Sequence, residues 1–411
     1  MIRYGNNAVV GQSGGPTCAI NSSLAGVISA SLENKNIHKI YGMANGIDGF
    51  LHERLYDLTE LFGDKPEDIT LLQNTPGAAL GSCRFKLPKP EDDKKFYENL
   101  FSLLKKYEIG HFFYIGGNDS MDTTAKVSAY AKANEIDINV VGVPKTVDND
   151  LCGTDHSPGF GSAAKYVATV FAELRRDTAV YTQKCVTIVE VMGRDAGWLT
   201  AAASLSSTEH TQGADLIYLP ELPFSYDKFF TDIEKVWESH PDALVAVSEG
   251  IRLENGTYIG ADGSNVDKFG HVQLSGASKV LEHKIKEHFG CKVRSVELNT
   301  PQRCASHISS LTDITESFGV GAHAVKAATC GESGVMAAII RNESEPYSVH
   351  YEALDVQKIA NQVKAVPREY INNDGNGITV SGIKYLRPLI NGENIVKYQN
   401  GIPMHYIFPK I

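Results

Sequence analysis

Short runs of apolar and β-branched residues recur along this chain of 411 residues, and most of them stop at a glycine or at a charged residue. A strand that is covered on both faces has apolar side chains at successive positions, so these runs predict buried strands rather than half-exposed ones. We expect such strands over 8–10, 107–115, 138–143, 185–191, 215–219, 243–247 and 293–298.

Helical segments follow several of these strands. The sequence predicts helices over 19–32, from about 120 through 133, over the alanine-rich stretch after Trp198, and over 277–288. Strands that alternate with helices are typical of doubly wound α/β folds with largely parallel sheets. The segment 268–276 interrupts this alternation. A chain of 411 residues is long for one hydrophobic core, which favours two domains and an appended segment from about residue 352.

The composition is that of an ordinary globular protein, with 42% hydrophobic and 21% charged residues. A formal net charge of −10 argues against a nucleic-acid-binding surface, because phosphate backbones are bound by basic faces. The chain has no apolar run near the ~20 residues of a membrane span and no signal-peptide pattern at its start, so we expect a cytoplasmic protein without a membrane partner. The seven cysteines form no Cys-x-x-Cys pair, which favours neither zinc nor disulfides.

Three glycine-containing loops are candidates for ligand binding. Residues 11–16 include Gly14 and Gly15, whose backbone N–H groups can approach an anion, although a tight turn without a ligand explains them as well. Asp119 follows the strand 107–115 and suits either a helix cap or a site carboxylate. Gly159-x-Gly161 formally matches a dinucleotide fingerprint, but a loop rather than a strand precedes it, so we expect no dinucleotide there.

Residues 144–150 carry two carboxylates and one ammonium directly after an apolar run. In open parallel sheets, ligands bind outside the carboxyl ends of the strands. We therefore expect a single cleft to be lined by charged residues that follow the strands, together with Arg84 from the glycine-punctuated loop 76–85: Asp119, Lys145, Asp148, Asp150, Arg194, Glu249 and Arg303. Cations and carboxylates in one cleft suit phosphoryl transfer, in which cations and Mg²⁺ offset the oxygen charge and a carboxylate accepts a proton.

Three motifs in order, over 116–120, 144–150 and 192–194, resemble those of the phosphofructokinase family, and the resemblance covers about residues 5–350. Within the family, the chain is similar to the pyrophosphate-dependent branch. The resemblance implies two Rossmann-like α/β domains with the active site in the cleft between them. It implies a phosphoryl-donor domain of residues 1–159 and 302–352, a sugar-phosphate domain of residues 160–301, and a C-terminal extension of residues 353–411 that covers the sugar-phosphate side.

The resemblance also implies roles for individual residues. Asp148 resembles the general base that takes the proton of the sugar 1-hydroxyl, Thr146 its neighbouring substrate contact, and Arg84 the arginine that bridges the transferring phosphoryl group. The implied pyrophosphate contacts are Gly14, Gly15, Arg84, Gly117, Asp119, Ser120 and Lys145. The implied sugar-phosphate contacts are Thr146, Asp148, Met192, Gly193, Arg194, Glu249, Arg294 and Arg303, with Tyr385 and Arg387 as candidates from the tail. The implied Mg²⁺ ligands are Asp150, Asp119 and Asn118.

Two positions favour pyrophosphate over ATP as the donor. ATP-dependent relatives have glycine where this chain has Asp119 and Lys145. The Asp119 carboxylate would crowd and repel the α-phosphate of a nucleotide, whereas the Lys145 ammonium adds a cation for compact pyrophosphate.

The chain also departs from the family pattern. Asn118 replaces a metal-binding aspartate, and Cys185 replaces an arginine that many bacterial members supply to the 6-phosphate from a neighbouring subunit. Ala25 and Ser29 replace effector-binding arginines, so we expect no such allosteric regulation.

The resulting hypothesis is a reversible, Mg²⁺-dependent transfer from pyrophosphate to fructose 6-phosphate in glycolysis or gluconeogenesis, giving fructose 1,6-bisphosphate and phosphate. An ATP-dependent 6-phosphofructokinase is the alternative of the same class. A non-catalytic regulatory subunit of the same fold is the alternative of a different class. We expect a homodimer or homotetramer whose ligands are these two small substrates.

Overall fold

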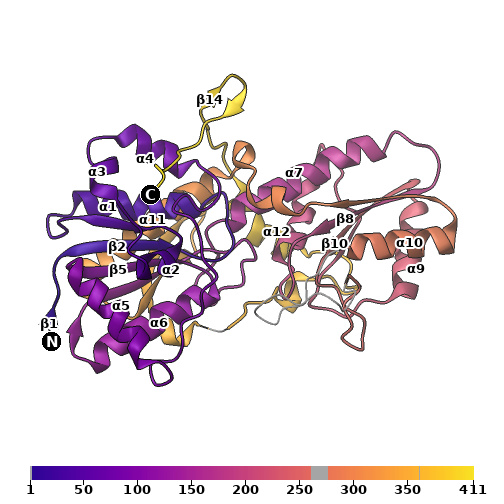
Figure 1. The fold of residues 1–411 in the computed structure, drawn as a ribbon. Coiled ribbons are helices and arrows are strands. Elements are labelled where there is room, and N and C mark those ends of the chain that lie inside the picture. The colour runs from indigo at the N-terminus through magenta and orange to yellow at the C-terminus, as the bar shows by residue number, and fades with distance from the viewer. Residues whose placement is uncertain (1, 261–275, 361) are drawn as a thin grey trace.

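The computed structural model describes residues 2–260, 276–360 and 362–411, so that the predicted interruption at 268–276 lies, except for Gly276, outside the described residues. Two α/β units lie side by side, each built on its own sheet (Figure 1). The first sheet has seven strands in the order β13-β12-β7-β5-β2-β3-β4. Their bounds are β2 Asn7–Gln12, β3 Ile40–Met43, β4 Leu55–Asp57, β5 Ile109–Gly116, β7 Asn139–Pro144, β12 Val335–Arg341 and β13 Val349–Asp355.

The five inner strands of the first sheet are parallel, and the edge strands β4 and β13 are antiparallel to their neighbours. Successive side chains of a strand point to opposite faces, and both faces of this sheet are covered. Phe112 of β5 packs in the core on one face and Phe113 in the core on the other. This two-sided burial explains why β2, β5 and β7 have continuous apolar runs, as predicted.

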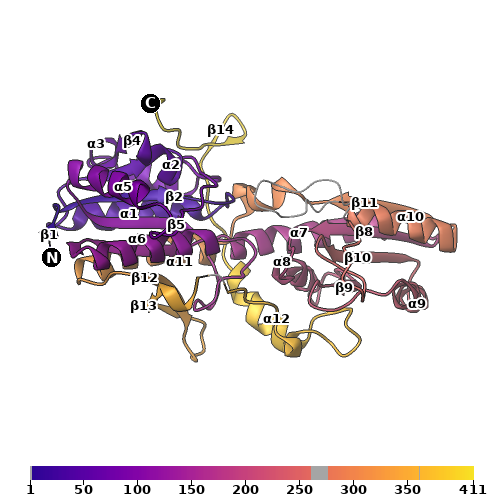
Figure 2. The same ribbon diagram turned by 60° about the horizontal axis from the view of Figure 1, so that its bottom comes forward.

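Helices cover the first sheet on both sides (Figure 2). Helix α11 (Leu311–Thr329) packs against α1 (Ile20–Glu33). A Cβ atom at Gly26 would lie 2.0 Å from the carbonyl oxygen of Phe318, so glycine is what allows these two helices to touch. The other helices of this unit are α2 Gly46–Leu51, α3 Leu58–Phe62, α4 Pro66–Gln73, α5 Lys94–Lys106 and α6 Asn118–Ala133, and β1 (Ile2–Arg3) pairs with β6 (Ile136–Asp137).

The second sheet has four parallel strands in the order β11-β8-β10-β9. Its elements are α7 Phe160–Thr178, β8 Cys185–Val191, α8 Trp198–Ala201, β9 Leu216–Tyr218, α9 Tyr226–Trp237, β10 Asp242–Ser248, α10 Ala277–Phe289 and β11 Lys292–Glu297. The structure confirms the strands predicted here, and the two sheets together confirm the predicted α/β class.

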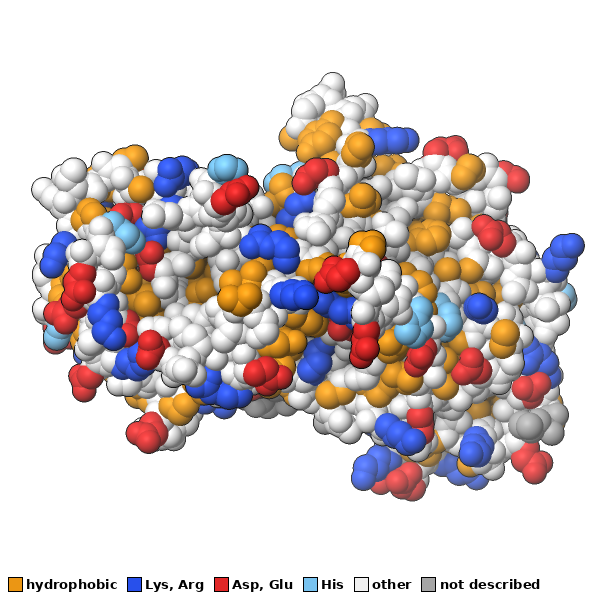
Figure 3. Space-filling view, turned by 180° about the vertical axis from the view of Figure 1, so that it is seen from behind, with side chains coloured by type: hydrophobic (Ala, Val, Ile, Leu, Met, Phe, Trp, Pro, Cys, Tyr) orange, Lys and Arg blue, Asp and Glu red, His pale blue; other side chains and the backbone are white. Residues whose placement is uncertain are grey.

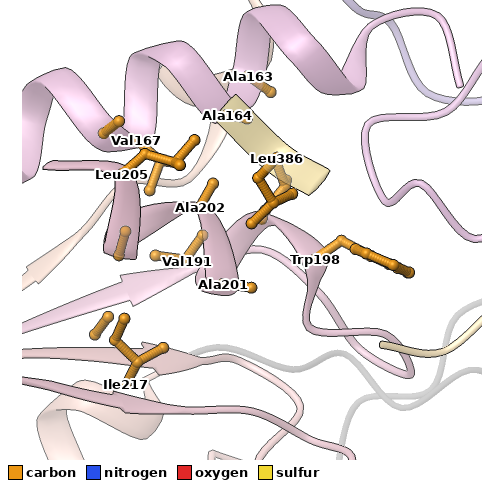
Figure 4. Packing of buried hydrophobic residues seen from close by; sticks show 14 of the residues in the cluster. Ala163, Ala164, Val167, Val191, Trp198, Ala201, Ala202, Leu205, Ile217 and Leu386 are labelled. Carbon is orange, nitrogen blue, oxygen red and sulfur yellow. The ribbon is translucent and has the colours of Figure 1, made fainter. Parts of the chain in front are cut away.

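The alanine-rich helix after Trp198 is shorter than predicted, because α8 gives way to a 3₁₀ helix over Ala202–Ser206. The hydroxyls of Ser204 and Ser206 donate to the carbonyl oxygens three residues earlier, at 2.7 and 2.5 Å, and such local bonds compete with the α-helical pattern. Figure 4 shows the small side chains of this turn packed between α7, β8 and Leu386 of the tail.

The tail after β13 contacts both units. Helix α12 (Val380–Leu386) contributes Leu386 to the core beneath α7, on the second unit. Further along, the rings of Tyr406 and Phe408 pack against Phe62 of the first unit in tilted and edge-to-face arrangements, with centroids 4.9 and 5.9 Å from that of Phe62. The predicted boundary at 352/353 cuts through β13, and the tail packs on more than the sugar-phosphate side.

A two-stranded hairpin of the tail projects from the body (Figure 3). It consists of β14 (Tyr398–Gln399) and β15 (Ile402–Pro403). No helix within the described ranges is both long enough and apolar enough to cross a membrane.

Candidate active site

The carboxyl ends of strands from both sheets border one cleft of about 480 Å³. All eight charged residues that the sequence predicts to meet do line it: Arg84, Asp119, Lys145, Asp148, Asp150, Arg194, Glu249 and Arg303. Gly14, Gly15, Gly117, Asn118, Ser120, Thr146 and Met192 line it as well. The parallel strands bring these residues together although they are far apart in the sequence, as expected for ligand sites of such sheets.

The loop after β2 forms one wall of the cleft. Gly14 has φ +77°, and a Cβ atom there would lie 3.3 Å from the Lys145 ammonium nitrogen. That nitrogen donates to the carbonyl oxygen of Gly15 at 2.7 Å. The N-terminus of α1 is capped by the Thr17 hydroxyl, which accepts from the backbone N–H of Ile20 at 2.8 Å. The glycines of this loop and the Lys145 ammonium beside it can therefore contact an anion. The backbone N–H groups in the first turn of α1 are already partly hydrogen-bonded.

The second wall begins at the N-terminus of α6. Its N-cap residue is Gly117, which provides no side-chain cap, and Asp119 lies exposed in the first helical turn. Asp119 is therefore not the N-cap residue of α6, and it lines the cleft. Asn118 donates weakly to Asp150, with 3.5 Å between Nδ2 and Oδ2, and its Oδ1 atom is buried without a partner among the described residues.

Residues 144–150 form the floor. Asn149 is buried and has φ +53°, so the chain turns sharply between Asp148 and Asp150 and both carboxylates reach the cleft. Burial and the charges of Asp150 and Glu249 raise the pKa of Asp148 to about 7. Burial lowers the pKa of Lys145 to about 8. A carboxylate with a pKa near 7 and an ammonium beside it suit proton abstraction and anion binding at neutral pH.

The second unit supplies the opposite wall. The backbone N–H of Gly193 donates to Glu249 at 3.2 Å, and Met192 N–H donates to Gln302 at 3.3 Å. The Gly193 carbonyl accepts from the Ser248 hydroxyl. These bonds fix the loop that presents Arg194, while Gly193 itself lies just behind the cleft surface.

The arginines of this wall have hydrogen-bonding capacity left. The Nε atoms of Arg194 and Arg303 are buried and have no acceptor among the described residues. Arg303 ends the 3₁₀ turn Thr300–Arg303 that follows β11. Half-buried arginines whose Nε atoms lack acceptors beside a cleft are suited to an anionic ligand such as a phosphate.

Besides Gly193, three predicted sugar-phosphate contacts do not line the cleft: Arg294, Tyr385 and Arg387. Arg294 lies early in β11, paired in register with Thr187 near the start of β8, and its guanidinium contacts Asp177 at 2.9 Å. It is therefore at the opposite end of the sheet from the cleft of its own chain. Tyr385 lies beneath the floor, where its hydroxyl donates to the carbonyl oxygen of Asp155 at 2.6 Å.

Arg387 is likewise occupied elsewhere. Its guanidinium donates to the carbonyl oxygens of Leu205 and Ser207 at 3.0 and 3.4 Å. Arg387 was a candidate from the tail for the sugar-phosphate contacts, and in this structure it anchors the tail to the second unit.

Sequence reasoning missed Lys86 and Asp195 as cleft residues. Lys86 lies two residues after Arg84 in the same loop, and Asp195 directly follows Arg194, so their positions next to predicted site residues were the available signal. Asp195 contacts Arg252 at 3.3 Å at the rim.

The cleft residues fit a magnesium ion that is shared with a substrate. Within the described ranges, no group of three or more His, Cys, Asp or Glu residues converges on one point. Mg²⁺ is usually held by one or two carboxylates together with substrate phosphates and water, so a full protein shell is not required. The unpartnered Oδ1 atom of Asn118 beside Asp150 is an oxygen donor of the right chemistry.

Comparison with known proteins places this site in a family. The family model described as Phosphofructokinase matches residues 7–328. The chain belongs to the phosphofructokinase family. The resemblance noted from the three motifs is therefore confirmed, and its span agrees with the match.

Curated relatives that match nearly the whole chain are named as pyrophosphate-dependent enzymes of this family. The pyrophosphate--fructose 6-phosphate 1-phosphotransferases of Halomonas elongata and Methylococcus capsulatus are each 41% identical to this phosphofructokinase-family chain. The matches cover 97% of the chain in both cases, and 95% and 94% of the relatives. A crystal structure of a pyrophosphate-dependent phosphofructokinase from Nitrosospira multiformis, 38% identical, has a TM-score of 0.88 and covers 97% of this chain and 95% of that one.

Proposed function

We propose that this chain transfers a phosphoryl group reversibly from pyrophosphate to the 1-hydroxyl of fructose 6-phosphate, giving fructose 1,6-bisphosphate and phosphate. The observation that carries this proposal is the convergence of Asp119 and Lys145, the two donor-selecting residues, in one cleft with Asp148 and Asp150. The curated relatives named for this reaction match nearly the whole chain and support it.

In the forward direction, the sugar O1 atom attacks the phosphorus of one phosphoryl group, and the bridging P–O bond of pyrophosphate breaks to release phosphate. Asp148 accepts the proton of the 1-hydroxyl. Its pKa of about 7 leaves a substantial fraction ionised at neutral pH, and it becomes a useful acid for the reverse reaction. Positioning and charge stabilisation supply most of the catalysis in phosphoryl transfer.

The positively charged side chains of the cleft form two groups, one for each substrate. We assign Arg84 and Lys145 to pyrophosphate, because both lie with the loops of the first sheet. We assign Arg194 and Arg303, on the opposite wall, to the sugar phosphate. Residues 1–159 and 302–352 would thus form the donor side and residues 160–301 the sugar side.

Asp150, Asn118 and Asp119 would hold Mg²⁺. The ion would neutralise phosphate oxygens while it is bound. We further propose that the chain works in the cytoplasm as a homodimer or homotetramer, a state that light scattering on the purified protein measures directly.

Turnover of the purified chain with each donor tests the proposal. We expect fructose 1,6-bisphosphate to form from fructose 6-phosphate with pyrophosphate and Mg²⁺, and the reverse reaction to run with phosphate. Strong turnover with ATP and none with pyrophosphate would establish the ATP-dependent alternative. The absence of turnover with either donor would favour a regulatory subunit.

A further inference from the structure

The C-terminal extension reaches under the catalytic floor at Lys364. The backbone N–H of Lys364 donates to the carbonyl oxygen of Asp150 at 2.8 Å, and its carbonyl oxygen accepts from the indole of Trp198 at 2.8 Å. Two residues on, the Val366 N–H donates to Glu221 at 2.9 Å. Glu221 also accepts from Gly197 at 2.8 Å. This part of the tail is therefore tied to the second unit on one side and to residue 150 on the other.

The ammonium group of Lys364 points into the underside of the same turn. It donates to the carbonyl oxygens of Asp155 at 2.7 Å and Thr154 at 3.2 Å, and it lies 3.5 Å from the Oδ1 atom of Asn149. An ammonium has three N–H donors and no acceptor, so three oxygens around it match its capacity. The side chain closes the loop that runs from Asn149 to Asp155.

The backbone conformation of Asn149 sets the positions of the two aspartates beside it. Its φ of +53° lies in the left-handed region, which a residue other than glycine seldom adopts unless its surroundings hold it there. The Oδ1 atom accepts from the Ser157 N–H at 2.9 Å, and the Nδ2 atom donates to the Tyr385 hydroxyl at 3.4 Å. This conformation is what aims the flanking Asp148 and Asp150 into the cleft.

We propose that Lys364 is a positioning residue for phosphoryl transfer, which it supports by holding the turn at Asn149 so that Asp148 and Asp150 keep their places in the cleft. This inference rests on the proposed function, and it adds a residue that lies outside the cleft and beyond the 7–328 match to the phosphofructokinase family model. Lys364 touches no substrate and acts only through the turn.

The expected effect is on turnover rather than on substrate binding. Displacement of a reacting group by about 1 Å can cost on the order of 100-fold in rate. Lys364→Met keeps an unbranched side chain only one atom shorter and removes its three donors. We expect it to lower kcat roughly 10- to 100-fold while KM for both substrates stays within about twofold, because Arg84, Arg194 and Arg303 are untouched.

Lys165→Met is the matched control. The Lys165 ammonium also ties the tail to the body through a backbone carbonyl, that of Gly392 at 2.7 Å, but it lies away from the floor. Both variants lose one lysine and one tail anchor. We expect Lys165→Met to keep the kcat of the unsubstituted enzyme.

The test combines steady-state kinetics with hydrogen–deuterium exchange of the full chain. Peptides covering 146–161 are expected to exchange faster in Lys364→Met and at the original rate in Lys165→Met. In Lys364→Ala, methylammonium is expected to restore part of kcat, whereas tetramethylammonium, which has no N–H donor, is expected to restore none.

Several outcomes would overturn the proposal. An unchanged kcat, unchanged exchange over 146–161, or equal rescue by both amines would each do so. A rise in exchange throughout the chain, with similar losses in both lysine variants, would assign a purely structural role to Lys364. If the unsubstituted chain failed to use pyrophosphate, the proposed function itself would fall, and this result is distinct from an active chain that tolerates Lys364→Met.

Discussion

Replacement of Asp119 and Lys145 by glycine, together and singly, should shift donor preference from pyrophosphate towards ATP. Asp119 lies exposed on the cleft wall, and Lys145 is buried with its ammonium 2.7 Å from the Gly15 carbonyl oxygen. On the proposed assignment, the first substitution removes a carboxylate that would repel the nucleotide. The second removes an ammonium that would bind the smaller donor.

The size of the shift follows from the two environments. A carboxylate and a phosphate about 5 Å apart repel each other by roughly 1–3 kcal/mol at effective dielectric constants of about 20–80. A hydrogen bond to a charged group contributes about 1.5–3 kcal/mol. Together these effects predict that the ratio of kcat/KM for ATP to kcat/KM for pyrophosphate rises by roughly 50-fold to 10⁴-fold in the double variant.

The assay follows fructose 1,6-bisphosphate formation with each donor over a range of concentrations, for the four members of the double-mutant cycle. The double variant Asp122→Asn with Lys126→Met is the control, because this neighbouring pair on α6, 2.6 Å apart, removes the same charges outside the cleft. A donor ratio that changed by less than about threefold, or equally in the control, would refute the assignment of donor selection to these residues.

Three further predictions follow from the site and its support. Asp148→Asn should lower kcat by about 10²–10⁴, the usual contribution of a positioned base, and leave KM for fructose 6-phosphate nearly unchanged; an unaltered kcat would remove the base role. Asn118→Leu should raise the Mg²⁺ concentration for half-maximal activity by about tenfold, measured by titration after chelation, and an unchanged value would exclude its Oδ1 atom as a ligand. Burial lowers the pKa of His156, but its contacts with Asp155 at 2.9 Å and Glu316 at 2.6 Å outweigh this effect and raise the pKa to about 8. The stabilisation by protonated His156 is fully present below pH 6.5 and is lost as the pH rises through about 8. Denaturant titrations should therefore show that the free energy of unfolding falls by about 2 kcal/mol over this range, and that His156→Gln abolishes the fall. An equal fall in His156→Gln would contradict this assignment.

Most strands with two-sided burial were predictable from the sequence, although the inner strand β12 (Val335–Arg341) was missed. Strands such as β5 are apolar at successive positions because both of their faces are covered, and this pattern is readable without a structure. Strand β13 was missed because it is an edge strand with partly exposed side chains. The short strand β3 gives too few residues for any periodicity.

The candidate site was predictable because its chemistry lies at strand ends. Seven of the eight charged residues follow parallel strands that end on one edge, a rule that needs no coordinates, whereas Arg84 lies in the loop between α4 and α5. Arg294 does not line the cleft, because it precedes the carboxyl end of its strand by three residues. Lys364 gave no signal in the sequence, because it lies in a segment without periodicity. The partners of its ammonium group, Asn149, Thr154 and Asp155, are 209 to 215 residues away in the sequence.

The contact between the tail and the catalytic turn has a consequence for biosynthesis. Ribosomes make the N-terminal part first, and α/β units can fold as they emerge. Asn149 and Lys364 are separated by 215 residues, so the turn is completed only when the second sheet and much of the tail have been made. The enzyme would therefore acquire its activity late in synthesis. Nascent chains that have both sheets but lack the tail would be folded yet almost inactive.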